Sequence, residues 1–280
     1  MTHNVHDTFA GLTLRRPLLM GIVNVTPDSF SDGGEAFDRA AAIARGRALT
    51  AQGADIIDIG GESTRPGAQP VTIDEECARV VPVIETLSAE GIVVSVDTRH
   101  SLVMAEAARA GARIINDVSG LEGDGDALRV AAQSGTDIVL MHMRGEPGTM
   151  QKAPHYVDVC AEVLGYLEAR VAACVAAGIA REKIALDPGI GFGKTDAHNL
   201  TLIAGLERFS ALGLPILLGV SRKSFIGRIA GVDDPKARLG GSLAAALFGI
   251  ARGAAIVRVH DVAQTRQAVD IWCALAESSS

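Results

Sequence analysis

The chain has 280 residues, of which 48% are hydrophobic, and its 33 acidic and 26 basic residues give a formal net charge of -7. This composition provides enough apolar material for one large core, and the length allows one large domain or two small ones. The acidic balance argues against a nucleic-acid partner, because proteins that bind nucleic acids normally present a basic face. An anionic substrate would therefore have to be attracted by local cations.

The sequence predicts neither a membrane span nor a secretory signal. The longest stretch near the C-terminus without a charged residue, Leu239 to Ala251, is too short to cross a bilayer. The N-terminal region lacks a basic segment followed by an apolar core and a small-residue cleavage site. We therefore expect a cytoplasmic protein.

Apolar, β-branched runs recur along the chain, and each is followed by an Ala-rich amphipathic stretch. This alternation is typical of βα units on a parallel sheet. The predicted strands lie at residues 18–24, 54–60, 92–97, 113–118, 136–142, 183–188, 215–220 and 255–260. The predicted helices lie at residues 36–52, 73–90, 101–110, 126–134, 157–177, 197–211, 235–251 and 262–276.

Eight βα units in a chain of this length favour an α/β fold of the (β/α)8 TIM-barrel type, with residues 1–280 in a single domain. A doubly wound open sheet is the alternative, but it predicts a G-x-G-x-x-G turn after the first strand, and that turn is absent. Residues 1–17 should form a short hairpin or cap over the barrel floor, and residues 277–280 a tail. In such barrels the chemistry occurs where the strands end.

Polar residues stand at the C-terminal ends of the predicted strands. Asp97, Asn116 and Asp187 end strands that are otherwise apolar, so we expect their side chains in the barrel mouth. An unpaired carboxylate there costs several kcal/mol or takes up a proton, and these groups would suit a ligand rich in N–H donors. The alternative is that some of them cap the helices that follow.

The sixth predicted strand is followed by D-P-G-I-G-F-G-K, residues 187–194. The segment resembles a phosphate-binding loop but lacks the G-K-[ST] ending of the Walker A motif. We expect its glycines to let the backbone approach a flat ligand, with Phe192 offering an apolar edge.

The last two strand ends carry cations. Lys223 is either a solvated surface lysine or a cation over the barrel mouth, and Ser221 and Ser224 beside it favour a helix N-terminus that could bind a carboxylate. Arg258 and His260 alternate along the eighth strand and should point to the same side, in a position where barrels often hold phosphate. A core histidine beside a rim arginine is the alternative.

Metal ligation is predicted only for a hard cation. No His/Cys/Asp group has zinc spacing, so Mg²⁺ held by Asn24 and substrate oxygens is the expected metal site. His142, between Met141 and Met143 at the end of the fifth strand, is open to either a structural or a functional role.

Eight motifs, one after each predicted strand, together resemble the dihydropteroate synthase family. In chain order they are N-V-T-P-D-S-F-S-D-G-G, D-I-G-G-E-S-T-R-P-G, S-V-D-T, I-N-D-V, L-M-H-M, D-P-G-I-G-F-G-K, S-R-K-S and R-V-H-D-V. The resemblance covers nearly everything from Met20 to Gln267. It implies a transferase of folate biosynthesis that condenses 6-hydroxymethyl-7,8-dihydropterin pyrophosphate with 4-aminobenzoate, with Mg²⁺ as cofactor and a homodimeric assembly.

The resemblance also implies roles for individual residues. The pterin would contact Asp97, Asn116, Val118, Met141, Asp187, Gly219 and Lys223. The pyrophosphate would contact Asn24, which also holds the metal, and Thr64, Arg65, Arg258 and His260. The aminobenzoate would contact Phe30, Thr64, Pro66, Phe192, Lys223 and Ser224. The catalytic residues would be Asp97, Asp187, Lys223, Asp32 and Arg65.

The implied path has pyrophosphate leaving before the amine attacks, because an aromatic amine is a poor nucleophile. Asp97 and Asp187 would then stabilise a pterin-methyl cation, and no covalent enzyme intermediate is needed.

The loop after the first strand, Asn24 to Gly34, is polar and rich in turn residues. We expect Asn24 to be fixed at the strand end. Residues 26–34 should act as a mobile lid that closes over bound substrates, bringing Phe30 onto the aminobenzoate and Asp32 towards its amine or the arginine of the second loop.

Two other functions stay open at this point. One is a catalytically silent pterin-binding protein, against which the intact first and second motifs argue. The other is a pterin-dependent methyltransferase that uses methyl-tetrahydrofolate and a corrinoid partner, which would not need the anion sites at Lys223–Ser224 and Arg258–His260.

Overall fold

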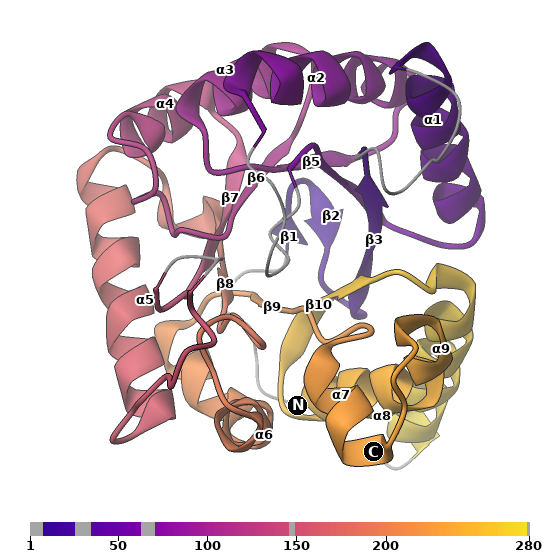
Figure 1. The fold of residues 1–280 in the computed structure, drawn as a ribbon, viewed down its shortest axis with the longest axis vertical. Helices are drawn as coiled ribbons and strands as arrows, with labels where there is room; N and C mark the ends of the chain where they lie inside the picture. Colours follow the sequence, from indigo (N-terminus) through magenta and orange to yellow (C-terminus); the bar gives the residue numbers. More distant parts are fainter. Residues whose placement is uncertain (1–7, 26–34, 63–70, 146–148, 279–280) are drawn as a thin grey trace.

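Eight parallel strands of the described chain close into a barrel with helices around its outside (Figure 1). This computed structural model describes residues 8–25, 35–62, 71–145 and 149–278. The strands follow one another in the order β10-β3-β4-β5-β6-β7-β8-β9, and β9 pairs with β10 to complete the circle. The predicted TIM barrel is confirmed. The strands are β3 (Leu18–Asn24), β4 (Ile56–Gly60), β5 (Val94–Asp97), β6 (Ile114–Asp117), β7 (Asp137–Met141), β8 (Ile184–Asp187), β9 (Ile216–Leu218) and β10 (Ala254–Val259).

The strands are rich in Ile, Val and Leu because both of their faces are buried. One set of side chains fills the barrel interior, and the other packs against the surrounding helices. The helices are α1 (Glu35–Ala51), α2 (Ile73–Ala89), α3 (Ser101–Arg109), α4 (Ala127–Ser134), α5 (Val159–Ala176), α6 (Asp196–Ala204), α7 (Ser224–Ala230), α8 (Leu239–Ala251) and α9 (Val262–Ser278). No helix of the described residues is long and apolar enough to cross a membrane.

Several helices differ from the prediction. The helix expected at residues 197–211 is divided at Gly205 into α6 and the 3-10 helix η3 (Leu206–Leu212). Glycine weakens a helix, and here a β-carbon would lie 3.2 Å from Cys160 Sγ, so this position also packs closely on α5. α5 begins at Val159 because the Asp158 side chain accepts the Ala161 N–H and caps it.

The repeat after β9 holds two α-helices, whereas the sequence predicted bounds for only one helix, at residues 235–251, and a helix start near Ser224. α7 begins at Ser224, where a helix start was expected. It ends at Ala230, and Gly231 caps it with a φ of +68°, a left-handed backbone conformation that glycine often adopts at helix C-termini. The helix expected at residues 235–251 then begins as the 3-10 helix η4 (Pro235–Arg238) and continues as α8. α9 continues to Ser278, into the segment expected as a tail.

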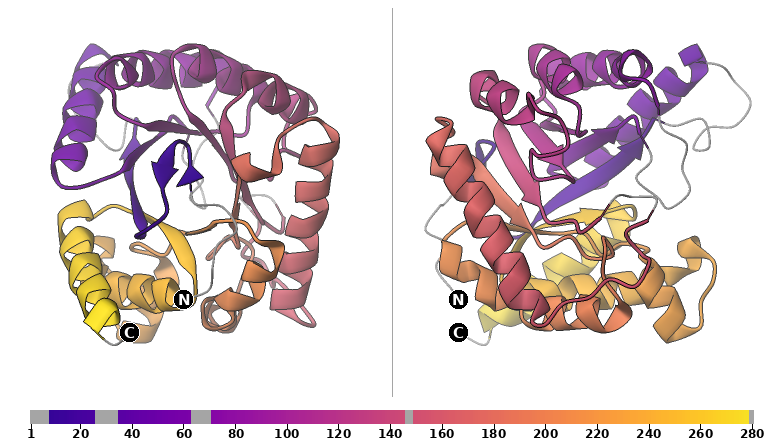
Figure 2. Two further views of the ribbon diagram at one scale, coloured as in Figure 1. Left: turned by 180° about the vertical axis from the view of Figure 1, so that it is seen from behind. Right: turned by 60° about the vertical axis from the view of Figure 1, so that its left-hand side comes forward.

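A short antiparallel hairpin, β1 (Thr8–Phe9) and β2 (Leu12–Thr13), closes the N-terminal end of the barrel, which we call the floor. Figure 2 shows it in indigo across the barrel seen from behind. Phe9 is fully buried and packs with the apolar residues that begin the strands, among them Leu18, Ile56 and Ile114. The Ala10 N–H donates to Asp137 Oδ2 (2.6 Å), which ties the hairpin to β7. The predicted hairpin is therefore confirmed.

Candidate active site

The opposite end of the barrel, which we call the mouth, carries a row of polar strand ends. The parallel register pairs Asn24 with Gly60, Gly60 with Asp97, and Asp97 with Asn116. Farther round the barrel, Met141 pairs with Asp187. The strand-end residues predicted to converge are therefore neighbours at one rim, as the barrel geometry requires.

Arg258 joins two of the mouth carboxylates across the barrel interior. Its Nε donates to Asp58 Oδ2 (2.6 Å) and its Nη2 donates to Asp97 Oδ2 (2.7 Å), while Asn116 Nδ2 donates to the same Asp58 oxygen (3.2 Å). Asp58 is fully buried, and its Oδ1 has no hydrogen-bond partner among the described residues. Burial raises the pKa of Asp97 to about 7, even though the Arg258 guanidinium opposes the shift.

This arrangement was missed by the sequence reasoning, which assigned Arg258 to an anion site with His260 and gave Asp58 no role. In the structure the guanidinium of Arg258 serves as the counter-ion of Asp58 and Asp97. The alternation of Arg258 with His260 could not reveal partners on β4 and β5. Ion pairing across a closed barrel depends on which strands face one another.

Asp187 and Lys223 form the second charged part of the mouth. Asp187 is almost completely buried, and its Oδ1 accepts the Gly189 N–H (2.7 Å). Burial raises the pKa of Asp187, and the Lys223 ammonium is among the groups that lower it. Burial in turn lowers the pKa of Lys223 to about 8, while the Asp187 carboxylate opposes that shift. Each group therefore helps to keep the other ionised.

Phe192 provides an apolar surface beside this pair. Lys223 Nζ lies 4.2 Å from the centre of the Phe192 ring, in cation–π geometry. At Gly191, where φ is +83°, a β-carbon would lie 3.3 Å from Lys223 Cδ. The loop therefore passes close to the lysine stem, and the expected proximity of Phe192 to Lys223 is present.

Two other glycines of the same loop serve packing. A β-carbon at Gly189 would lie 1.9 Å from the His142 carbonyl oxygen, and one at Gly193 would lie 2.2 Å from the Arg144 carbonyl oxygen. These glycines let the loop after β8 approach the backbone that follows β7. At both positions the structure shows contact with protein backbone where the sequence predicted approach to a flat ligand.

Lys194, at the end of this loop, is a buried cation that the sequence reasoning left without a role. Its Nζ lies 3.0 Å from His142 Nδ1, and it donates to the carbonyl oxygens of Phe192 (2.9 Å) and His142 (3.3 Å). Only 1% of Lys194 is exposed, and burial lowers its pKa to about 7. Three acceptors match the three protons of an ammonium group.

His142 has a structural environment. Its ring makes an edge-on contact with Tyr166 at 5.0 Å between centres and lies 6.1 Å from Tyr156. Burial, together with the nearby Lys194 ammonium, lowers the pKa of His142 to about 3, so the ring is neutral at physiological pH. Of the two roles open to His142, the contacts favour the structural one.

The other described site residues lie at or shortly after strand ends of the mouth. The backbone N–H of His260 donates to Ser221 Oγ (3.2 Å), and the ring nitrogen Nδ1 of His260 lies 3.0 Å from the same oxygen. Ser224 is the first residue of α7 and is exposed. Val118 directly follows β6 and Met141 is the last residue of β7, and both are buried. Gly219 directly follows β9.

Asn24 is half-buried at the end of β3. A β-carbon at Gly60 would lie 3.7 Å from Asn24 Oδ1 and 3.7 Å from Asp97 Oδ2, so the two side chains flank the same point. No group of three or more His, Cys, Asp or Glu side chains in the described part of the chain could hold a metal ion.

Five predicted site residues lie outside the described residues. They are Phe30, Asp32, Thr64, Arg65 and Pro66. The predicted lid at residues 26–34 lies there as well.

The chain is similar to proteins of one enzyme family. The profile of the pterin binding enzyme family matches residues 20–260. A dihydropteroate synthase of Neisseria meningitidis serogroup C is 52% identical over 94% of each chain. The dihydropteroate synthase of Escherichia coli K12 is 50% identical over 93% of this chain and 92% of its own.

Solved structures agree with these similarities. The dihydropteroate synthase of Xanthomonas albilineans with 4-aminobenzoic acid superimposes with a TM-score of 0.90 at 50% identity, covering 95% of this chain and 96% of its own. Another structure from the same organism, in complex with 7,8-dihydropteroate, has a TM-score of 0.87 at 47% identity and covers 95% of each chain.

Proposed function

The chain belongs to the dihydropteroate synthases of the pterin-binding enzyme family, and we propose that its barrel mouth binds and activates both substrates of that reaction. It condenses 6-hydroxymethyl-7,8-dihydropterin pyrophosphate with 4-aminobenzoate, giving 7,8-dihydropteroate and pyrophosphate. The main support for this function is the 50% sequence identity, over 95% of this chain, to a synthase whose structure was solved with 4-aminobenzoic acid. The polar groups of the mouth supply a chemical reason for it.

We propose that the pterin lies between Asp187 and Lys223. Asp187 Oδ1 is occupied by the Gly189 N–H, whereas Oδ2 has no hydrogen-bond partner among the described residues and can accept N–H groups of the pterin edge. Asn116 and Asp97 would bond the remaining ring nitrogens, and Lys223 would donate to the ring carbonyl. Val118, Met141 and Gly219 would line the ring.

The pyrophosphate would lie at the rim of the mouth. We assign its binding to His260, Asn24, Arg258, Thr64 and Arg65. Support comes from the closeness of His260 to the β9–α7 loop and from the position of Asn24 at the end of β3. Arg258 reaches this region only from its ion pairs with Asp58 and Asp97, so its main contribution there would be long-range positive charge.

Mg²⁺ is the cofactor we propose. Mg²⁺ typically binds one or two protein oxygens together with substrate phosphates, and the Asn24 amide oxygen beside Asp97 fits that donor set. The ion would supply positive charge to the leaving pyrophosphate.

The aminobenzoate would pack against Phe192 and the Lys223 stem, with its carboxylate near Ser224. The 4.2 Å contact between Lys223 Nζ and the Phe192 ring supports an apolar wall at this point. Phe30, Thr64 and Pro66 would complete the site. Asp32 would approach the amine.

For the chemical step we propose that pyrophosphate departs before the amine attacks. Asp97 and Asp187 would stabilise the positive charge that develops on the pterin methyl carbon, and Lys223 would stay protonated near neutral pH because its pKa is about 8. Asp97, whose pKa is about 7, must be ionised to contribute, so Arg258 acts as its ionising partner.

We also propose a homodimer in the cytoplasm, with only small-molecule substrates as ligands. Sedimentation of the purified protein and fractionation of the cells that produce it would test these two points.

The decisive experiment is turnover. The purified chain is incubated with pterin pyrophosphate, 4-aminobenzoate and Mg²⁺, and dihydropteroate and pyrophosphate are quantified separately. Both products should form in equal amounts. Pyrophosphate released without 4-aminobenzoate would support departure before attack, and the absence of dihydropteroate would refute the function.

A further inference from the structure

Arg222 lies between two residues of the candidate site, Ser221 and Lys223, in a backbone conformation that few arginines adopt. Its φ is +60°, and the Lys223 N–H closes a turn onto the Val220 carbonyl (3.2 Å). A positive φ in the third position of such a turn normally selects glycine or asparagine. An arginine here indicates that the surrounding structure holds it in place.

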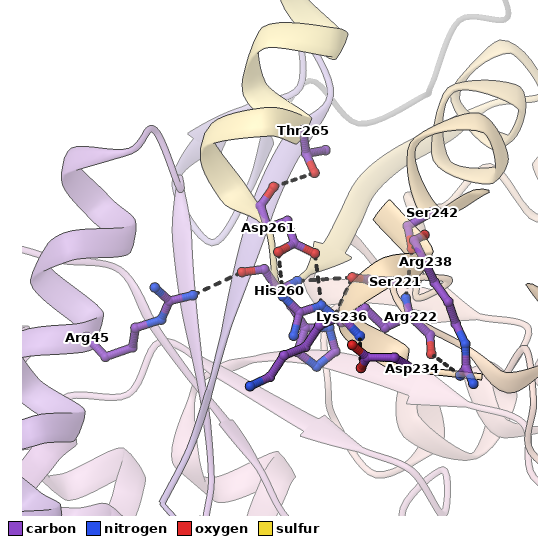
Figure 3. Close-up of polar contacts among 10 residues, drawn as sticks. All are labelled: Arg45, Ser221, Arg222, Asp234, Lys236, Arg238, Ser242, His260, Asp261 and Thr265. Atoms are coloured by element: carbon purple, nitrogen blue, oxygen red, sulfur yellow. Dashed lines mark hydrogen bonds and ion pairs between the residues drawn. The ribbon is translucent and has the colours of Figure 1, made fainter. Parts of the chain in front are cut away.

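Four hydrogen bonds hold Arg222 from both sides (Figure 3). Its N–H donates to Ser242 Oγ (2.9 Å), and its carbonyl accepts from Arg238 Nη1 (3.1 Å). Its guanidinium donates through Nε (2.9 Å) and Nη2 (2.5 Å) to the two carboxylate oxygens of Asp261. Backbone and side chain are therefore both fixed.

Ser242 and Arg238, the partners of Arg222 on the α7–α8 side, are themselves held by hydrogen bonds. Ser242 is buried, and its hydroxyl donates to the Arg238 carbonyl (2.8 Å). Arg238 also donates to the carbonyls of Val232 (3.0 Å) and Asp233 (2.5 Å) in the loop after α7. A β-carbon at Gly227 would lie 2.5 Å from Arg238 Nε, so α7 rests directly on this arginine. The helix that begins behind Lys223 therefore has little freedom to move.

Asp261 connects Arg222 to the loop after β10. The Asp261 carbonyl accepts from the Thr265 N–H (3.0 Å) and from Thr265 Oγ1 (2.7 Å) at the start of α9. The carbonyl of the preceding His260 accepts from Arg45 Nη2 of α1 (3.1 Å). His260 also contacts Ser221 Oγ, so the Arg222–Asp261 ion pair and the Ser221–His260 contact join the same two loops.

We propose that Arg222 is a positioning residue, whose ion pair with Asp261 sets the distance between the loop that carries Lys223 and the loop that carries His260. The inference rests on the proposed function, in which Lys223 binds the pterin and aminobenzoate while His260 binds the pyrophosphate. The two loops then hold opposite sides of the bond that breaks. A small shift between them should affect the transition state more than the binding of either fragment.

Three variants separate the backbone from the side chain. Arg222→Gly tolerates the left-handed turn and removes the ion pair, Arg222→Lys keeps a charge without the two-bond geometry, and Asp261→Asn weakens the pair from the other loop. Arg222→Gly should lower kcat by about 10- to 100-fold and change KM for 4-aminobenzoate by less than about threefold. Arg222→Lys should recover part of kcat.

A neighbouring ion pair provides the matched control. Arg228 of α7 donates to Asp196 through the same two nitrogens, at 2.8 and 2.5 Å, but the pair is exposed and does not join the two loops. Arg228→Ala should leave kcat and both KM values within about twofold, because such surface pairs contribute little.

A second readout is independent of turnover. The ¹⁵N signals of the His260 ring, assigned by comparison with His260→Gln, should shift in Arg222→Gly and Asp261→Asn and stay unchanged in Arg228→Ala. If Arg222→Gly does not fold, Arg222→Lys and Asp261→Asn carry the test. Failure of the wild-type chain to form dihydropteroate would refute the proposed function, and the His260 signals would then decide the positioning role alone. Unchanged His260 signals in both pair variants, or a kcat within twofold of wild type, would overturn the positioning role.

Discussion

The two ends of the barrel use the same eight strands for opposite purposes. At the floor the strands begin with apolar residues such as Leu18 and Ile56, and Phe9 of the hairpin fills the space between them. At the mouth several of these strands end in Asn or Asp, and desolvation raises the pKa values of Asp97 and Asp187. Burying carboxylates opposes folding, so the floor must contribute stability that the mouth gives up.

The comparison also explains why the mouth carries Arg258 and Lys223. A buried carboxylate is tolerated when a cation lies within hydrogen-bond or Coulombic reach, and the two cations serve Asp97 and Asp187 in this way. In the proposed function the same charges also act on the substrates. Under that proposal, stability and function are coupled at the mouth and separate at the floor.

The largest effect should come from the floor. Phe9→Ala removes a fully buried ring and should lower the free energy of unfolding by about 3–5 kcal/mol, as measured by denaturant titration. The kcat and both KM values should stay unchanged at a temperature where the variant is folded. Phe9→Leu, which keeps most of the apolar volume, is the control and should cost less. A changed KM for either substrate would break the separation between floor and mouth.

The next effect should come from the mouth. Asp187→Asn should weaken binding of pterin pyrophosphate by roughly 10- to 150-fold, corresponding to about 1.5–3 kcal/mol for a lost charge-assisted contact. Stability should change little, because the amide can still accept the Gly189 N–H, and removing a carboxylate whose pKa is raised by burial offsets the loss of the Coulombic partner of Lys223.

The floor offers a matched control for this change. Asp137 is another carboxylate whose pKa is raised by burial and whose oxygen accepts a backbone N–H, that of Ala10. Asp137→Asn should leave the affinity for pterin pyrophosphate unchanged in calorimetric titration. If Asp187→Asn bound the substrate within a factor of two of wild type, the acceptor role of Asp187 would be wrong.

The third effect is a change of slope, in the pH dependence of stability. Burial lowers the pKa of Lys194 in the folded chain to about 7 from its ordinary 10.5, so between these values the unfolded chain binds more protons. The free energy of unfolding should therefore rise with pH across this window, by up to about 1.4 kcal/mol per pH unit from this group. Lys194→Met should remove that contribution and leave the one from Lys223, whose pKa is about 8.

An exposed lysine serves as the control for the pH experiment. Lys236→Met makes the same substitution at an exposed position and serves as the reference for the slope. Equal slopes in Lys194→Met and wild type would mean that Lys194 is not the buried titrating group.

Strand positions and strand-end chemistry could be predicted because they depend on local pattern. Strands buried on both faces must be continuous apolar runs, and a polar residue that ends such a run, like Asn116 or Asp187, is forced towards the mouth. The ends of the helices were harder to predict than the positions of the strands. The division at Gly205 and the separate α7 depend on close packing that periodicity does not encode.

The barrel, the end at which its strands terminate and the residue types present there can all be read from the amino-acid order, because they follow from periodicity and strand direction. Which charges pair depends on how distant parts of the chain pack together. Asp58 and Arg258 are 200 residues apart, His142 and Lys194 are 52 apart, and Arg222 and Asp261 are 39 apart. Closure of the barrel brings Asp58 and Arg258 together, whereas the other two pairs lie in loops that follow neighbouring strands. Burial then strengthens these contacts.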